Sequence, residues 1–238
     1  MNKAFYRKWF ILAVLFILPV IFLLFLYPST HNYNTLDIVK ENIKEIDNLE
    51  FLEKKNTTLE ENITIVNFLG KSPMNHITSA LNLKELVYDK FKGFKKFQIL
   101  TISSSGSFKS LKEVKNELLK TDELKYWYFA KADDKIIKEL FNSFKSSKTL
   151  DSTNYISQVY IVDKNRNQRG RIDDREDEEI INNKKIYGLY SYNSIKVSEI
   201  KNKMNDDVRI LFTEYRQKRK GKFDSNNRRI RNLEGFEN

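Results

Sequence analysis

The sequence predicts an α/β domain in which helices flank a central mixed sheet, preceded by a transmembrane helix. Three features carry this prediction: an uncharged apolar run near the N-terminus, nearly continuous apolar runs typical of buried strands, and intervening segments with apolar residues three and four positions apart. The chain has 238 residues, of which 40% are hydrophobic and 13% aromatic. That size and composition suit one domain of ordinary size with a real core, plus appendages.

The uncharged run covers residues 9–27 and would span roughly 30 Å as a helix, which is the thickness of a bilayer core. Aromatic residues lie at both edges of the run, as at membrane interfaces. Basic residues precede it and the next one is Lys40, which predicts a single-pass cell-membrane anchor at residues 1–28 with a cytoplasmic N-terminus and an extracytoplasmic domain. The alternative is a cleaved signal peptide, but the run is unusually long and no small-residue cleavage site follows it.

Residues 29–45 are expected to form a linker that leads into a short helix, and residues 51–52 and 57–59 a small hairpin. Apolar content and turn residues then predict strands at residues 63–69, 97–103, 126–129, 158–163, 168–172 and 186–192. The polar residues 164–167 predict a turn that joins two of these strands as a hairpin.

Amphipathic spacing predicts helices between the strands and one at the end. Their expected positions are after a cap at Thr78 or Ser79, around 111–119, from Asp133 or Asp134, and across 197–215. Helical crossovers imply parallel strands, and the closing hairpin adds an antiparallel edge. This order of elements is the thioredoxin-like arrangement, and we assign it to residues 46–219, followed by a basic tail at 220–238.

Composition excludes several kinds of chemistry. The chain has no cysteine and two histidines, so disulfides, thiol catalysis and thiolate metal sites are excluded, and a multi-histidine metal centre is not expected. The formal net charge of +10 is concentrated at the two ends, above all in residues 216–231, where eight basic residues face Asp224 alone.

The basic residues of this C-terminal segment are candidates for an interaction with a polyanion. They are Arg216, Lys218, Arg219, Lys220, Lys222, Arg228, Arg229 and Arg231. Three interpretations stay open: a solubilising tail, a surface for anionic lipid or an acidic membrane partner, and a nucleic-acid site. The predicted topology disfavours nucleic acid, because the tail would lie outside the cytoplasm.

The segment VNFLGKSPMNHITSALNLKEL, at the first strand-to-helix turn, resembles the Sco/SenC family of membrane-anchored copper chaperones of cytochrome oxidase assembly. Further matches follow in the same order: LTISS with Gly106 after it, Trp127 with Phe129 and Asp133, and QVYIVD with Gly170 and Arg171. The resemblance covers roughly residues 46–215, apart from an insertion near 173–195.

The resemblance implies a copper site at three positions, but this chain differs at each of them. The two family cysteines fall on Ser72 and His76, and the family histidine falls on Tyr155. Because Cu(I) prefers soft sulfur donors, and because thiol–disulfide exchange needs sulfur, we expect no metal, no cofactor and no enzymatic activity. The expected function is docking or assembly at a membrane complex, with a respiratory oxidase as the implied partner.

The residues alone offer three further candidate sites. Met74 and His76 share a loop and could bind Cu(I) weakly, and Ser72 with His76 has the residue types of a nucleophile and base. The acidic residues Asp173, Asp174, Glu176, Asp177, Glu178 and Glu179 could bind a divalent cation. They lack the spacing of a calcium loop, so a solvated turn is the expected structure.

Overall fold

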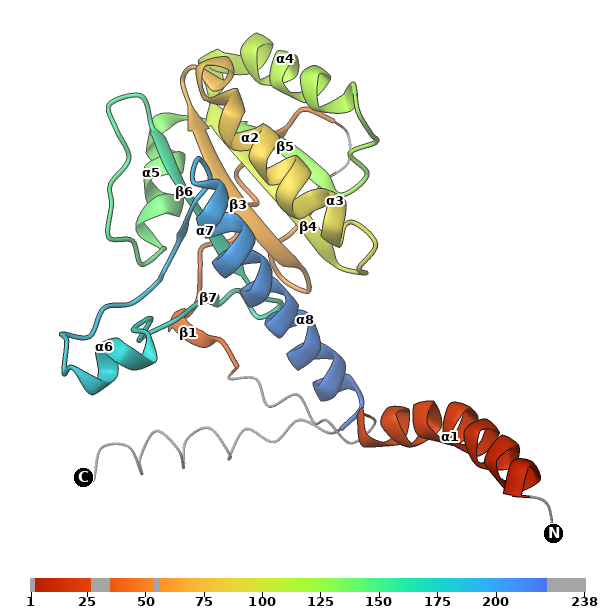
Figure 1. The fold of residues 1–238 in the computed structure, drawn as a ribbon. Helices are drawn as coiled ribbons and strands as arrows, with labels where there is room; N and C mark the ends of the chain where they lie inside the picture. The colour runs from red at the N-terminus through yellow and green to blue at the C-terminus, as the bar shows by residue number, and fades with distance from the viewer. Residues whose placement is uncertain (1–2, 27–34, 54–55, 222–238) are drawn as a thin grey trace. The chain divides into compact units, whose positions relative to one another are not determined.

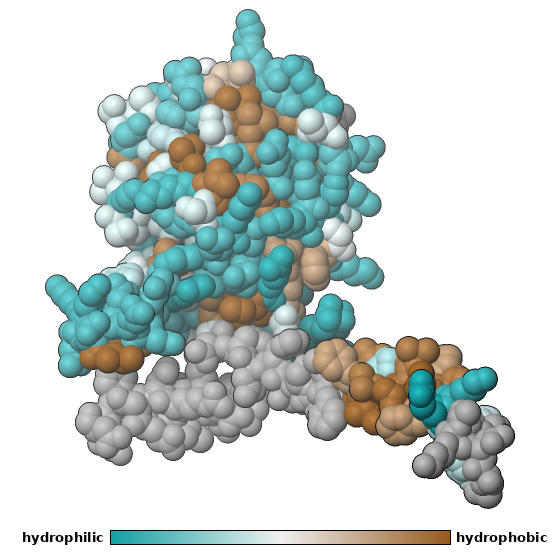
Figure 2. Space-filling model, in the orientation of Figure 1, coloured by the Kyte–Doolittle hydropathy of each residue, from teal (hydrophilic) through white to brown (hydrophobic). Residues whose placement is uncertain are grey.

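The computed structural model describes residues 3–26, 35–53 and 56–221, in two compact units, 1–34 and 35–238. The first contains helix α1 (Lys3–Leu26), in which Tyr6–Leu24 is long and apolar enough to cross a membrane. None of that stretch is buried inside the structure, and Figure 2 colours α1 mainly as hydrophobic. The helix therefore has the length and composition of a membrane anchor.

The second unit is built on one mixed sheet (Figure 1). Its strands are β1 (Asp37–Lys40), β2 (Glu50–Phe51), β3 (Ile63–Gly70), β4 (Phe97–Ser104), β5 (Trp127–Ala132), β6 (Tyr155–Val162), β7 (Gln168–Gly170) and β8 (Tyr192–Asn193). The strand order is β1-β7-β6-β3-β4-β5-β2, and β8 pairs with β6. Strands β3, β4 and β5 are parallel, whereas β6 runs antiparallel beside β3 and β7 antiparallel beside β6.

The helices of this unit connect the strands in the expected order. They are α2 (Ile77–Leu83), α3 (Asp89–Phe91), α4 (Phe108–Leu119), α5 (Asp134–Asn142), α6 (Asp177–Ile181), α7 (Val197–Glu199) and α8 (Asn205–Arg219). A π-helical segment joins α2 to α3, and another joins α7 to α8. These elements form the thioredoxin-like fold that the sequence predicts. In chain order, its core elements are strand β3, a helix, the parallel strand β4, the antiparallel strand β6, its hairpin partner β7 and the terminal helix α8.

Two apolar cores cover the two faces of the sheet. Every residue of β3 and β4 is buried, which explains their unbroken apolar runs. One core joins the sheet to α2, α3, α4 and α8, and the other joins it to α5 and to residues 43–49. The sheet places β3, β4 and β5 side by side in chain order. Because connections between parallel strands are right-handed, the two connecting helices α2 and α4 lie on the same face of the sheet.

A buried charge cluster fixes α8 and β1 to the sheet. The guanidinium of Arg169, on β7, donates to Asp163 (3.0 Å), to Glu214 on α8 (2.5 Å) and to the carbonyl of Leu36 (2.8 Å). All three charged side chains are almost fully buried. The cluster therefore joins the strand hairpin to the C-terminal half of α8.

Several sequence predictions at the sheet edges are wrong. Residues 37–40 form strand β1 and not the linker and short helix that we expected, because they pair with β7. Residues 50–51 pair with β5 and form no hairpin with 57–59, while Leu59 enters the core. Within 186–192 only Tyr192 belongs to a strand. These strands are defined by distant partners, which local patterns do not reveal.

The predicted cap of the first domain helix is also wrong. Neither Thr78 nor Ser79 is the cap: both lie inside α2, which follows a short 3-10 turn, Pro73–His76. Pro73 suits the first position of that turn, because its missing N–H would have no helical partner there. The hydroxyl of Ser79 is buried and instead donates to Ser194 Oγ at 2.6 Å.

Candidate functional site

The loop that follows β3 is the centre of the candidate site. Gly70 ends the strand with a φ of 66°, and a Cβ there would lie 2.4 Å from the carbonyl oxygen of Thr153. Only glycine fits this close approach without strain. The amide of Lys71 donates to the same oxygen at 2.8 Å, so residues 71–76 pass directly beside the start of β6.

His76 and Tyr155 meet in this region. Their ring centroids are 3.4 Å apart and the rings are nearly parallel, with 5° between their planes. Tyr155 is held there because it is the first residue of β6 and pairs in register with Leu69 of β3. Both side chains are partly buried. Two of the three positions that the resemblance predicts to correspond to the family's copper ligands are therefore in direct ring contact.

Asp151 fixes the turn that presents Tyr155. Its Oδ1 accepts from the amides of Thr153 (2.8 Å) and Tyr155 (2.9 Å) and from the Thr153 hydroxyl (2.7 Å). Burial works against the charged carboxylate, but these hydrogen bonds prevail and hold the pKa of Asp151 below its usual value. The turn therefore carries a negative charge next to the ring pair.

Burial and the charge of Asp151 act on both rings. Burial lowers the pKa of His76, and the neighbouring carboxylate opposes that shift. Burial raises the pKa of Tyr155, and the same carboxylate raises it further. Near neutral pH the pair is thus an uncharged imidazole lying on a protonated phenol.

Ser72 lies at the start of the same loop. Its carbonyl accepts from the amide of Asn75 at 3.0 Å and so opens the 3-10 turn that ends at His76. Within the described residues, no hydrogen bond joins the Ser72 hydroxyl to the His76 ring. The nucleophile–base geometry considered from sequence is therefore not formed. The match of Ser72, His76 and Tyr155 to the family's ligands stays a prediction.

Met74 contributes to packing. It is partly buried against the core beneath α2 and α4, and its amide donates to Ser110 Oγ at 3.2 Å. No group of three or more histidine, aspartate or glutamate side chains within the described ranges could hold a metal ion. A Cu(I) site built on Met74 and His76 would thus have only two protein ligands, an imidazole and a thioether. The Met74 side chain that carries the thioether already packs against the core.

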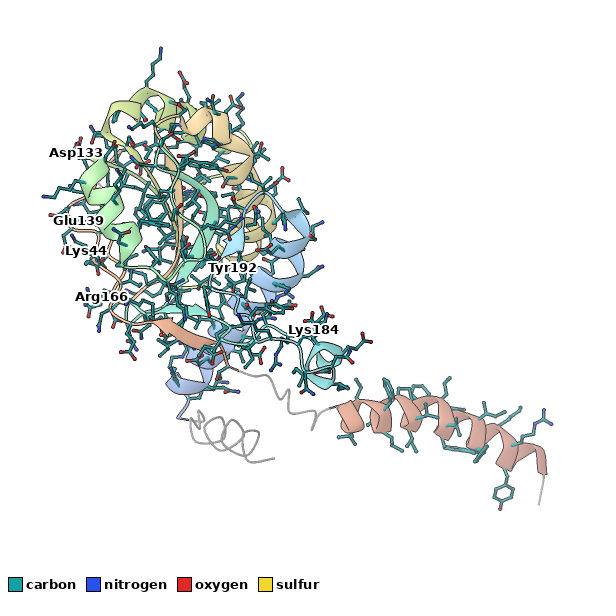
Figure 3. All side chains as sticks on the ribbon, turned by 90° about the vertical axis from the view of Figure 1, so that its left-hand side faces the viewer. Lys44, Asp133, Glu139, Arg166, Lys184 and Tyr192 are labelled. Carbon is teal, nitrogen blue, oxygen red and sulfur yellow. The ribbon has the colours of Figure 1, made fainter. Side chains whose placement is uncertain are left out.

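A polar depression that sequence reasoning missed lies next to the loop, at the carboxyl ends of β4 and β5. It has a volume of about 360 Å³ and is lined by Lys71, Ser104, Ser105, Gly106, Ser107, Asp133 and Asp134. Asp133 is labelled near the top of Figure 3. The run SSSGS after one strand and the Asp-Asp pair after the next were its only sequence signals.

The polar groups of this depression are paired with one another. Lys71 forms an ion pair with Asp134 (2.9 Å), and the hydrogen bond from Lys71 is the main reason that the pKa of Asp134 is lowered. Ser105 donates to Asp133 at 2.8 Å, and Ser107 donates to the carbonyl of Lys71 at 2.6 Å. The depression therefore fixes the loop to the N-terminal end of α4.

The acidic insertion is organised by its own ion pairs. Asp173 pairs with Arg175, Asp174 with Arg171 and Lys203, and Glu179 with Lys184. Glu176 and Glu179 form a capping box at the start of α6, so the segment is a helical excursion and not the expected turn. Three of the six carboxylates, those of Asp173, Asp174 and Glu179, have cationic partners in the fold, which weakens the alternative of a divalent cation.

The basic candidates at the C-terminus divide into two groups. Arg216, Lys218 and Arg219 lie in the last turns of α8, and Lys220 follows them. Lys218 forms an ion pair with Glu214 at 2.7 Å. The remaining candidates lie outside the described residues: Lys222, Arg228, Arg229 and Arg231.

Comparison with known proteins gives likenesses in structure only. No family model and no curated protein matches the chain. The chain is similar to solved Sco-family structures. The likeness to BsSco, a member of the Sco family of cytochrome c oxidase assembly proteins, has a TM-score of 0.48 at 16% identity and covers 74% of this chain and 96% of that one.

Two further structures give similar values. ScoI of Bradyrhizobium japonicum, with copper bound, has a TM-score of 0.42 at 15% identity over 72% of this chain and 99% of that one. The soluble domain of Sco1 from Bacillus subtilis has a TM-score of 0.41 at 14% identity over 73% and 94%. The thioredoxin-like assignment itself follows from the strand order of this chain.

Proposed function

We propose that this protein is a membrane-anchored, extracytoplasmic docking or assembly factor for a membrane complex, with a respiratory oxidase as the partner class. It works without copper, thiol redox chemistry or enzymatic turnover. The observation that carries the proposal is the stack of His76 on Tyr155 at the end of the sheet. The two rings stack face to face at positions where the resemblance implies metal ligands. The chain also has no cysteine that could supply a thiolate.

The chemistry of the donor set supports the absence of copper function. A serine hydroxyl and a phenol are hard oxygen donors, and the pKa of Tyr155 is raised, which keeps the phenol protonated. Cu(I) prefers thiolate and thioether donors. Met74 offers a thioether, but its side chain packs against the core. The alternative of a weak His76/Met74 copper site is therefore the less supported one.

The rigidity of the loop supports a role in recognition. Residues 71–76 are held at three points: Lys71 to Thr153, the Lys71 carbonyl to Ser107, and Met74 to Ser110. Asn75 follows the last of these points and is exposed, beside the half-buried His76. A surface that is fixed before binding loses little conformational entropy when a partner docks. The loop and the ring pair are thus suited to contact another protein.

The proposed topology rests on the charges around α1. Basic residues precede the apolar stretch and none follows before Lys40, which favours a cytoplasmic N-terminus. The domain would then face the extracytoplasmic side, where a membrane complex could be reached from the anchor.

Site-specific photocrosslinking in native membranes tests the proposal. A benzophenone amino acid replaces Asn75 in the loop or, as a matched control, Lys112 on the exposed side of α4. We expect an adduct containing a respiratory-oxidase subunit from position 75 and none from position 112. Equal adducts from both positions, or no oxidase subunit in either, would reject the proposed docking role.

A further inference from the structure

The domain carries an aromatic pair, one exposed ring on one partly buried ring, at the end of the sheet away from the candidate site, where β4 begins. Phe94 stacks on Phe212 of α8, with 4.3 Å between the ring centroids and 16° between the ring planes. The buried rings of Phe91 and Phe97 also contact the Phe212 ring, with centroid distances of 5.6 and 5.8 Å. Phe94 is nevertheless 38% exposed. The core therefore supports a fixed aromatic ring at the surface.

Several exposed cations lie next to this pair along the chain or along α8. Lys95 and Lys96 follow Phe94 on an exposed loop, and Arg216 lies one helical turn beyond Phe212. Within the described residues, none of these side chains forms an ion pair, and the same is true of Arg219 and Lys220. We call the surface made by Phe94, Lys95, Lys96, Phe212, Arg216 and Arg219 the basic aromatic end.

The neighbouring lysines Lys92 and Lys218 differ from these cations because they form ion pairs. Lys92 is paired with Asp89 and Asp122, and Lys218 with Glu214, so these cations are already neutralised. Exposed Glu60 and Glu61 precede β3, whose first amide donates to the carbonyl of Lys96. Among the residues that the structure describes, the unpaired cations of the basic aromatic end outnumber these two carboxylates.

The chain enters the domain near this end. Strand β1 leads to Ile43, whose amide donates to the carbonyl of Arg166 at 2.8 Å, in the turn between β6 and β7. Lys164 of the same turn lies over the ring of Tyr215 on α8, 5.1 Å from its centroid. Arg166 is labelled toward the bottom of Figure 3, away from Asp133. The first described residues of the domain thus lie beside the C-terminal half of α8, where Arg169 donates to both Leu36 and Glu214.

We infer that the basic aromatic end binds the anionic headgroups of the bilayer that holds α1; this rests on the proposed membrane anchor. Protein surfaces that bind the membrane interface combine apolar side chains such as phenylalanine with lysine and arginine, and these cations are attracted to an anionic leaflet. The covalent path from Leu26 to Asp37 spans at most about 40 Å, which keeps the domain close to the bilayer. The candidate site at the opposite end of the sheet then points away from the lipid.

The test uses the absence of cysteine in the chain, because one introduced thiol can be labelled alone. Gly93→Cys places a fluorophore on the loop before Phe94, and Gly106→Cys places it at the far end of β4 as the matched control. A Cβ at either position meets nothing within 4 Å. The full chain is inserted in nanodiscs of phosphatidylcholine alone or of phosphatidylcholine with phosphatidylglycerol, each containing nitroxide-labelled lipid.

We expect the nitroxide lipid to quench the label at position 93 about threefold more than the label at 106 in anionic nanodiscs. The difference should shrink in neutral nanodiscs and at high salt, because headgroup attraction is screened. Equal quenching at the two positions in anionic nanodiscs, or a difference that neutral lipid leaves unchanged, would overturn the inference. Comigration of the chain with the nanodisc reports on the anchor separately.

Charge variants provide a second, independent readout. Lys95→Gln with Arg216→Gln should abolish the extra quenching at position 93. Lys109→Gln with Lys112→Gln removes the same charge from exposed residues of α4 and should leave the quenching unchanged. An equal loss in both pairs would indicate a response to net charge and reject a defined surface.

Discussion

The imidazole of His76 lies flat on the phenol of Tyr155, although one belongs to the loop after β3 and the other to the first residue of β6. The contact depends on two features of the backbone. The register pairs Leu69 with Tyr155, and Gly70 lets the chain pass against Thr153. The ring pair is therefore a direct consequence of how strands β3 and β6 meet.

The first prediction concerns the correspondence with the family's ligands. Ser72→Cys, His76→Cys and Tyr155→His together should create stoichiometric Cu(I) binding, because two thiolates and an imidazole would converge where the rings now touch. Titration against a competing chelator measures it. A variant with the two cysteines that retains Tyr155 is the control and should bind Cu(I) more weakly. A triple variant that folds but binds no Cu(I) would show that these positions do not correspond to the ligands.

The second prediction concerns protonation of His76. Its pKa should lie below 6.5 because burial disfavours the imidazolium, and Asp151→Asn should lower it further by removing the carboxylate that opposes the shift. The asparagine side chain keeps an oxygen that can accept the same hydrogen bonds. NMR titration of the imidazole protons measures both values, with His31→Gln used to assign the two histidines.

The same shift has a consequence for stability. The unfolded chain binds a proton on His76 more readily than the folded chain, so the free energy of unfolding should fall as pH drops through about 6.5. His76→Gln should remove that part of the pH dependence, as measured by urea unfolding between pH 5 and pH 8. A titration of His76 above 6.5 would contradict the proposed burial effect.

The third prediction concerns the turn at Gly70. Gly70→Ala should lower the free energy of unfolding by about 1–3 kcal/mol or more, because the residue has a positive φ and the new Cβ would meet the Thr153 carbonyl. Gly106→Ala is the matched control, since a Cβ there meets nothing within 4 Å. Denaturant unfolding of both variants decides the matter. Equal effects would mean that the loop can move away from β6.

The parts of the fold that the sequence predicts are those with a local cause. Strands β3 and β4 are buried on both sides and so read as apolar runs, and α4 and α5 show one apolar face. Strands β1 and β2 are short edge strands whose pairing with β7 and β5 is set by residues far away in sequence. No local pattern of residues 37–40 or 50–51 distinguishes them from loops.

The candidate site shows the same division. The resemblance predicts a site at Ser72, His76 and Tyr155, and that correspondence stays a prediction. The contact between the His76 and Tyr155 rings depends on the register between β3 and β6, which the sequence does not display. The polar depression was missed because its groups come from three separate strand ends. The exposed stack of Phe94 on Phe212 likewise joins a loop to a helix distant in sequence.

The last prediction concerns the buried cation that joins β7 to α8. Arg169→Met should lower the free energy of unfolding by about 3–5 kcal/mol, because it removes the guanidinium that buried Asp163 and Glu214 share and leaves Glu214 with only its ion pair to Lys218. Arg209→Ala removes an exposed ion pair with Asp206 and should change the free energy of unfolding by at most about 1 kcal/mol. Denaturant unfolding measures both. A triple variant combines Arg169→Met with Asp163→Asn and Glu214→Gln. If it recovers most of the lost free energy of unfolding, the cause of the loss is buried charge without the guanidinium. If it is as unstable as Arg169→Met alone, the loss comes from packing and from the broken contact with Leu36.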